Sequence, residues 1–155
     1  TRPRFVACAS EMVAARRGMG AVRWLEGEAE ALPLPAASVD ALVVSFGLRN
    51  TTRPMAALAE IHRVLKPGAR FVCLEFSRPA AGLAPMYDLY SRWVIPALGA
   101  AVAGHADAYR YLVESIRRFP DQAGFAAMLR EAGFAQVGWT NLSFGIACLH
   151  EAQRA

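Results

Sequence analysis

Residues 39–76 read VDALVVSFGLRNTTRPMAALAEIHRVLKPGARFVCLEF, which predicts a strand, a helix and a second strand. Residues 39–46 (VDALVVSF) are almost entirely apolar, as is typical of a parallel strand covered on both faces. Pro54 stands where the first turn of a helix tolerates proline, and an apolar stripe runs from there to Leu65. Residues 70–76 (RFVCLEF) form the next buried strand. This strand–helix–strand unit predicts a layered α/β fold.

Upstream of this unit the predicted elements are short. Residues 4–9 (RFVACA) and 21–26 (AVRWLE) read as strands on either side of a helix, and a proline-punctuated loop covers residues 28–38. No GxGxxG or other glycine-rich turn follows the first of these strands, so the usual phosphate or nucleotide loop is absent. We therefore expect the C-terminal part of a larger sheet, or a shortened relative of one.

Downstream, a long helical region is predicted over residues 85–119. Asp121 and Gly133 then stand at the positions of an N-cap and a C-terminal glycine, which bound a shorter helix. Residues 134–142 and 144–149 read as two strands around a turn, and we expect them to form an antiparallel hairpin. This hairpin makes one edge of the sheet mixed.

Composition and charge exclude several classes of protein. The 155 residues suffice for one domain with a sizeable core. A hydrophobic share of 55% against 19% charged residues excludes a disordered or collagen-like chain. A net charge of +4 would favour anionic membrane surfaces or nucleic acid, but no cluster of five or more bases occurs, so we expect no nucleic-acid partner. The longest uncharged apolar run, residues 93–104, falls short of the roughly 20 residues that span a bilayer, so we expect a cytoplasmic protein.

The cysteines and histidines share no ligand spacing. No CxxC occurs, and the cysteines lie far apart in apolar runs, at Cys8, Cys73 and Cys148. The histidines are equally scattered, at His62, His105 and His150. We therefore expect three buried thiols in a reducing compartment, and neither a metal site nor a redox site.

Several motifs resemble those of one known family, in the same order. RVLKPG by itself suggests a class I methyltransferase that uses S-adenosylmethionine, whereas FGLRN is much narrower. The narrow motifs make the chain similar to the ubiquinone/menaquinone biosynthesis C-methyltransferases over essentially all of residues 4–150. The motifs are GEAEALP (27–33), VDALVVSFGLRN (39–50), HRVLKPG (62–68), LEFS (74–77), YDLYS (87–91) and YRYLVESIRRFPDQ (109–122).

This resemblance implies a Rossmann-like class I methyltransferase sheet, mostly parallel with a C-terminal antiparallel hairpin, whose first strand and helix are missing. A single domain would span residues 1–155, with a helical substrate-cover insert at about 83–120. The implied reaction is methylation of a ring carbon of a polyprenyl benzoquinol or demethylmenaquinol. The alternative is a non-catalytic quinone- or lipid-binding remnant of the fold, which the missing glycine-rich loop favours.

S-adenosyl-L-methionine is the cofactor that the resemblance implies. In open α/β sheets, ligands lie beyond the carboxyl ends of the strands. By the resemblance, Glu28 and the backbone of Ala29 recognise the adenine edge, and Ser45 contacts the cofactor. Where the family has an aspartate for the ribose hydroxyls, this chain offers Glu11. The alternatives are a loop carboxylate for Glu28 and, for Glu11, a first-turn carboxylate favoured by the helix dipole.

Arg49 and Asn50 are the candidate catalytic residues, because FGLRN ends the central strand. A ring carbon becomes a better nucleophile as its hydroxyl loses a proton. Arginine is too basic to accept that proton, but it can stabilise a phenolate or orient a water. The alternative is structural, with Arg49 paired to a nearby carboxylate and Asn50 capping a turn. Asp88 is a second candidate base, with a plain surface carboxylate as its alternative.

Residues 86–95 (MYDLYSRWVI) carry apolar side chains at helical spacing. Such a stripe is usually core, but it also suits a cover over a prenyl tail or peripheral docking on a membrane. The expected partners are thus a polyprenyl quinol and the inner face of the membrane. Because a sheet without its first strand exposes an edge and apolar surface, we also expect the isolated chain to form a homo-oligomer or to aggregate.

Overall fold

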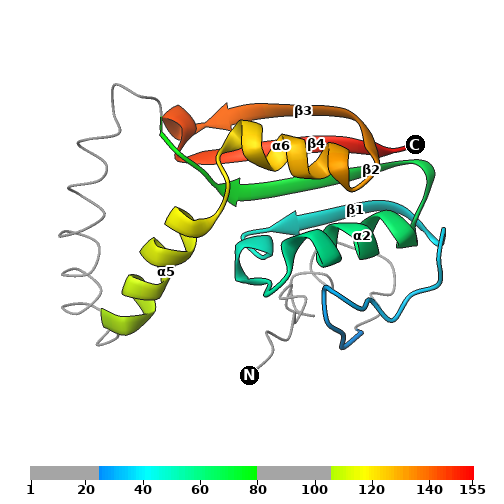
Figure 1. The fold of residues 1–155 in the computed structure, drawn as a ribbon, viewed down its shortest axis with the longest axis horizontal. Helices are drawn as coiled ribbons and strands as arrows, with labels where there is room; N and C mark the ends of the chain where they lie inside the picture. Colours follow the sequence, from blue (N-terminus) through cyan, green and yellow to red (C-terminus); the bar gives the residue numbers. More distant parts are fainter. Residues whose placement is uncertain (1–24, 80–105) are drawn as a thin grey trace, which may run out of the picture.

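The computed structural model describes residues 25–79 and 106–155. The described strands form one sheet in the order β1-β2-β4-β3 (Figure 1). The strands β1 (Val39–Ser45) and β2 (Leu65–Phe76) run parallel. The strand β4 (Ala147–Arg154) is antiparallel to both β2 and β3 (Phe134–Leu142). The expected α/β fold with a C-terminal antiparallel hairpin is confirmed.

The predicted strand–helix–strand unit is present, with one boundary corrected. The helix α2 (Pro54–Val64) begins at its proline, and Leu65 then takes an extended conformation. The second strand starts at Leu65, so the prediction that it starts at residue 70 was wrong. The reason is that Leu65 already pairs with Val39, and the Lys-Pro-Gly sequence lies in an irregularity of the strand register. Gly68 accommodates this irregularity with a φ of 78°.

The second half of the chain follows the predicted order of elements. The helix α5 (Ala106–Arg118) is followed by α6 (Gln122–Glu131). The Asp121 side chain accepts a hydrogen bond from the amide of Gly124 over 2.8 Å, which confirms the predicted N-cap. Gly133 follows with a φ of 94°, as a helix C-terminus favours.

The hairpin is confirmed, but its second strand begins at Ala147 instead of the predicted residue 144. Ser143 and Phe144 have left-handed backbones, with φ values of 48° and 59°. They therefore form the short 3-10 helix η3 (Ser143–Gly145), which delays the return strand. Phe144 is 78% exposed at this tip.

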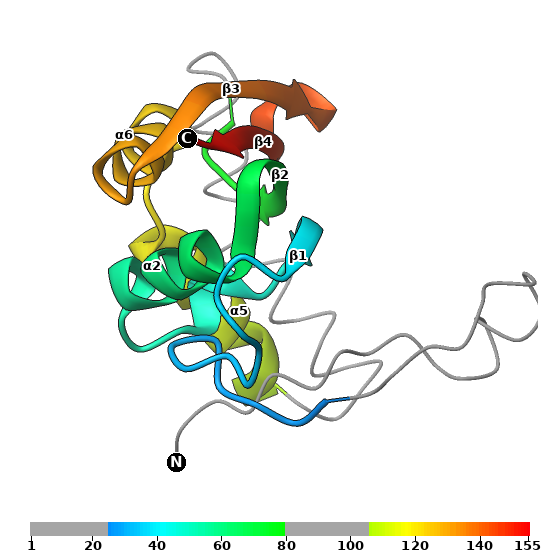
Figure 2. The same ribbon diagram turned by 90° about the vertical axis from the view of Figure 1, so that its right-hand side faces the viewer.

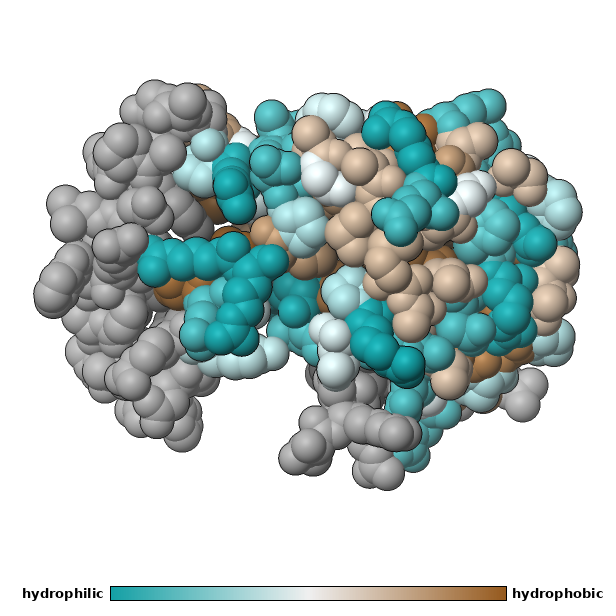
Figure 3. Space-filling model, viewed as in Figure 1, coloured by the Kyte–Doolittle hydropathy of each residue, from teal (hydrophilic) through white to brown (hydrophobic). Residues whose placement is uncertain are grey.

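The helices α2 and α6 lie on the same face of the sheet (Figure 2). The core lies between them and β2, where alternate residues of the strand are buried. On the outer surface of this helical layer, strongly hydrophobic residues appear only in small patches between hydrophilic ones (Figure 3). Among the described residues, the core lies on the helix-covered face, and its largest buried side chains include Phe71, Phe125, Leu48, Leu58 and Leu129.

The strand β1 forms one edge of the sheet among the described residues. Val43, near the middle of this strand, is 70% exposed. The strands expected at residues 4–9 and 21–26, and most of the helical region expected from residue 85, lie outside the described residues.

Candidate active site

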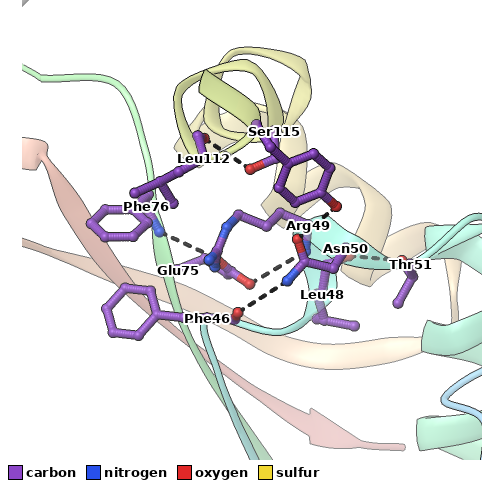
Figure 4. Close-up of polar contacts among 10 residues, drawn as sticks. Phe46, Leu48, Arg49, Asn50, Thr51, Glu75, Phe76, Leu112 and Ser115 are labelled. Atoms are coloured by element: carbon purple, nitrogen blue, oxygen red, sulfur yellow. Dashed lines mark hydrogen bonds and ion pairs between the residues drawn. The ribbon is translucent and has the colours of Figure 1, made fainter. Parts of the chain in front are cut away.

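Phe-Gly-Leu-Arg-Asn forms a tight turn at the carboxyl end of β1 (Figure 4). The Phe46 amide donates to the carbonyl of Leu74 over 2.8 Å, which continues the pairing with β2. The 3-10 helix η1 (Leu48–Asn50) follows. Leu48 is 1% exposed in the core, and the Thr51 hydroxyl donates to its carbonyl over 2.7 Å. The turn is therefore anchored from inside and closed at its end.

Arg49 is held by a buried carboxylate. Its Nη1 lies 2.9 Å from Oε2 of Glu75, a residue of β2 that is 1% exposed. The backbone amide of Arg49 also donates to Oε1 of the same carboxylate over 3.3 Å. The guanidinium carbon lies 5.8 Å and 5.3 Å from the ring centroids of Phe46 and Phe76. One carboxylate and two aromatic rings thus fix the guanidinium at the carboxyl end of the strands.

Asn50 links this turn to α5. Its Oδ1 accepts a hydrogen bond from the hydroxyl of Tyr111 over 3.2 Å, and its Nδ2 lies 3.5 Å from the carbonyl of Phe46. Tyr111 is 56% exposed, so its ring reaches the site from the solvent side. The side chains of Arg49, Asn50 and Tyr111 place a cation, an amide and a phenol at the same edge of the sheet.

The structural alternative for Arg49 and Asn50 is present: Arg49 is paired to a carboxylate, and Asn50 contacts its own turn. That pairing leaves donors over, because Nε of Arg49 is buried and has no partner within the described part of the chain. A structural contact and a binding role are therefore compatible at Arg49.

Sequence reasoning missed Glu75 and Tyr111. A signal for Glu75 exists in its strand, RFVCLEF, because a lone carboxylate in a buried strand needs a partner. Tyr111 has no comparable signal, since it lies off the apolar stripe of its helix.

Glu28 and Ala29 lie in a compact turn. The Ala31 amide donates to the carbonyl of Glu28 over 3.0 Å, and Ala29 is half-buried against the core. At Gly27 an added Cβ would lie 2.5 Å from Cδ of Pro33, so only glycine fits there. The two ends of the turn, Gly27 and Pro33, therefore lie in close contact.

This turn is attached to α2 by two charged pairs. Arg53, the N-cap residue of the helix, donates from its amide and from Nε to the Glu30 carboxylate, over 2.8 and 2.7 Å. These hydrogen bonds hold the pKa of Glu30 below its usual value. Glu60 accepts from the amide of Leu32 over 2.9 Å, and Arg63 donates to the Leu32 carbonyl over 3.2 Å. The loop and the FGLRN turn thus meet at the start of one helix.

Ser45 is the last residue of β1, and its side chain is exposed. The structure brings Ser45, Arg49 and Asn50 to the carboxyl end of this strand, as predicted from the sequence. The other two candidates, Glu11 and Asp88, lie outside the described residues.

Of the cysteines and histidines that the structure describes, Cys73, Cys148 and His150 are buried, and His62 is half-buried. Burial raises the pKa of the Cys148 thiol to about 11 and also raises that of Cys73, so both stay protonated at neutral pH. Nε2 of His150 lies 3.0 Å from the carbonyl oxygen of Gln122. Within residues 25–79 and 106–155, no group of three or more His, Cys, Asp or Glu could hold a metal ion. No helix in these ranges has the length and apolar character to cross a membrane.

The strand order and the polar carboxyl edge are those of the class I methyltransferase fold, which is confirmed by solved structures. A SAM-dependent methyltransferase from Thermotoga maritima, described as a possible histamine N-methyltransferase, matches 94% of this chain and 70% of its own, with a TM-score of 0.63 and 21% identity. The [4+2]-cyclase SpnF matches 92% of this chain and 61% of its own, with a TM-score of 0.64 and 20% identity. At these identities the likeness concerns the fold alone.

The chain belongs to the ubiE/COQ5 methyltransferase family, whose model matches residues 6–154. The ubiquinone/menaquinone biosynthesis C-methyltransferase UbiE of Rubrivivax gelatinosus is 63% identical over 139 residues, which cover 90% of this chain and 55% of the relative. UbiE of Caulobacter vibrioides is 56% identical over 146 residues, covering 92% and 58%. The chain therefore spans a little over half the length of these relatives. The predicted family is confirmed.

Proposed function

We propose that this chain carries the acceptor half of a methyltransferase that uses S-adenosylmethionine to methylate a ring carbon of a polyprenyl benzoquinol or demethylmenaquinol. The observation that supports this most directly is the Arg49 guanidinium, which is held at the carboxyl end of β1 with a buried donor left over. The names of the relatives supply the acceptor class, and the guanidinium supplies a group that binds an ionised ring hydroxyl.

The chemistry asks the protein mainly for alignment. When bound, S-adenosylmethionine supplies an already activated methyl group. Arg49 donates hydrogen bonds to the oxygen of the ring hydroxyl and so favours loss of its proton; the negative charge that results raises the electron density of the ring carbon that forms the new C–C bond. Asn50 and the Tyr111 hydroxyl orient the same oxygen or a water beside it. Asp88 is the proposed acceptor of the hydroxyl proton; the methylated ring carbon then loses its own proton to water, which restores the aromatic ring.

The cofactor would lie on the other side of the same edge. The Glu28 carboxylate suits an exocyclic amine, the Ala29 amide suits a ring nitrogen, and the Ser45 hydroxyl is exposed at the end of β1. These groups fit the adenosine part of the molecule. Glu11 is the proposed partner of the ribose hydroxyls.

The helical segment at about 83–120 is the proposed cover over the prenyl tail, and α5 is the part of it that the structure describes. Peripheral contact with the inner face of the membrane is supported by the exposed tip of the hairpin, where Leu142 and Phe144 are 39% and 78% exposed. A homo-oligomer is supported by the edge strand β1 and its exposed Val43.

Calorimetric titration of the chain with S-adenosylmethionine tests the cofactor half of this proposal. We expect micromolar binding that Ser45→Trp abolishes, because an indole at the strand end fills the space beside the cofactor. Ala41→Trp is the matched control, since Ala41 is exposed on the same strand and away from its carboxyl end, and this variant should bind normally. A folded chain that binds no cofactor would overturn the cofactor half of the proposal. Methylation of a short-chain quinol is the second measurement.

A further inference from the structure

Glu75 has an unusual environment for a carboxylate. It occupies a buried position in β2, in line with Phe71 and Cys73, and faces Cys148 across the strand pair. Each of these neighbours is almost fully buried and uncharged. Burying a charge costs free energy that its partner only partly returns, so a core selected for stability alone would favour an apolar residue here.

The Glu75 carboxylate spends its hydrogen-bonding capacity on the FGLRN turn. Oε2 accepts from Nη1 of Arg49 over 2.9 Å, and Oε1 accepts from the Arg49 amide over 3.3 Å. One carboxylate therefore fixes both the backbone and the side chain of a residue that is 26 positions away in sequence. Oε2 also accepts a hydrogen bond from the amide of Phe76, over 3.3 Å.

The Glu75 contact also determines which donors of Arg49 stay available. Nη1 is engaged, while Nε is buried and has no partner within the described residues. The rings of Phe46 and Phe76, 4.6 Å apart, lie against the guanidinium and restrict its rotation. A guanidinium held by one corner presents its other N–H groups in a fixed direction.

We propose that Glu75 is the positioning residue of the acceptor site: it fixes the Arg49 guanidinium so that its unpaired N–H groups bind the ionised oxygen of a phenolic ring. This inference rests on the proposed function and adds the group that makes Arg49 selective for an aryl oxide. The rival explanation is that the Glu75 carboxylate competes with a bound phenolate for the Arg49 guanidinium, and it predicts the opposite effect of removing the carboxylate. Removing a competing charge would strengthen the binding of a phenolate, whereas removing a positioning group weakens it.

The probe is 4-nitrophenol, whose ionised form absorbs visible light, so that binding of the phenolate and of the neutral phenol are measured separately by titration at two pH values. We expect the chain to prefer the phenolate and Arg49→Met to lose this preference. Glu75→Gln keeps the shape of the side chain and should weaken phenolate binding about tenfold, since small displacements of a positioned group have large effects. Glu75→Asp should restore part of the loss, and binding of the neutral phenol should change little.

Asp40→Asn is the matched control, because it removes an ion pair with Lys66 near the start of β1, at the opposite end of the strand from the site. It should leave phenolate binding unchanged. Three results would overturn the role of Glu75: tighter phenolate binding in Glu75→Gln, equal losses for phenolate and neutral phenol, or no phenolate binding by the parent chain. The titration uses no cofactor, so a chain that binds S-adenosylmethionine but shows one of these results retains the cofactor half of the proposed function. A chain that gives the expected phenolate results but binds no S-adenosylmethionine retains the role of Glu75 and loses the cofactor half of the proposed function.

Discussion

Tyr111 and Asn50 are joined across 61 residues of sequence by one hydrogen bond, in which the Tyr111 hydroxyl donates to Oδ1 of Asn50 over 3.2 Å. The bond ties α5 to the turn that ends β1. It also sets the orientation of the Asn50 amide, because the oxygen must face the phenol. The nitrogen is then directed toward the carbonyl of Phe46.

Removing this hydroxyl should impair the acceptor site without unfolding the chain. We expect Tyr111→Phe to lower kcat/KM for the quinol about fivefold, which corresponds to the roughly 1 kcal/mol of a typical hydrogen bond. Tyr111 is more than half exposed, so the melting temperature should barely change. In a double-mutant cycle, Asn50→Ala should make the second substitution nearly silent; additive effects would show that the two residues act independently.

A methyl group at Gly133, shortly after α6, should destabilise the folded chain. A φ of 94° at this residue disfavours any side chain, and an added Cβ would lie 3.3 Å from Nε2 of His62. We expect Gly133→Ala to lower the free energy of unfolding by about 1–2 kcal/mol. Gly138→Ala is the control, since a Cβ there meets nothing within 4 Å, and it should be neutral or slightly stabilising. Urea denaturation measures both, and equal effects would contradict the expectation.

Stability should fall as the pH drops from 7 to 5, because of two histidines. Burial lowers the pKa of both His62 and His150 in the folded chain. As the pH falls below about 6.5, the ordinary pKa of histidine, the unfolded chain therefore binds more protons than the folded chain, and this favours unfolding. The carbonyl of Gln122 can only accept, so Nε2 of His150 carries the proton and donates.

Replacing His150 with glutamine keeps a donor for that carbonyl but removes one titrating group. The dependence of the unfolding free energy on pH between 5 and 7 should therefore become shallower in His150→Gln. Thermal unfolding at several pH values measures the slope. An unchanged slope would mean that His150 does not contribute to it.

The two described cysteines should resist alkylation in the folded chain. Burial raises the pKa of the Cys148 thiol to about 11 and also raises the pKa of the Cys73 thiol, so both stay protonated at pH 8. We expect iodoacetamide at pH 8 to label neither residue until urea unfolds the chain, because the thiolate is the reactive form. Peptide mass spectrometry reads each site separately, and rapid labelling of either in the native state would contradict their burial.

Much of the fold could be predicted from local sequence because its signals are local. Pro54 at a helix start, Asp121 as an N-cap and Gly133 after a helix are each set by backbone geometry within a few residues. The start of β2 could not be predicted in this way. Lys-Pro-Gly reads as a turn, yet pairing of Leu65 with Val39 extends the strand through it, and that pairing depends on a segment far away in the chain.

The candidate site shows the same division. Ser45, Arg49 and Asn50 were found because a strand end and a motif place them together. Glu75 and Tyr111 were missed because their roles exist only through contacts between distant segments. A buried glutamate in an apolar strand indicates that a partner is present, but the sequence of the strand does not identify that partner.

The attachment of the 27–33 turn to α2 couples folding to affinity. Glu30 is hydrogen-bonded to Arg53, the N-cap residue of the helix, and the FGLRN turn ends only a few residues before it. The 27–33 turn and the FGLRN turn are therefore both anchored at the start of α2, and fraying of the first turn of this helix would displace both at once. Heating should then erode ligand binding at temperatures where the rest of the sheet is still intact, so the limit on working temperature would be set by one helix end instead of by the core.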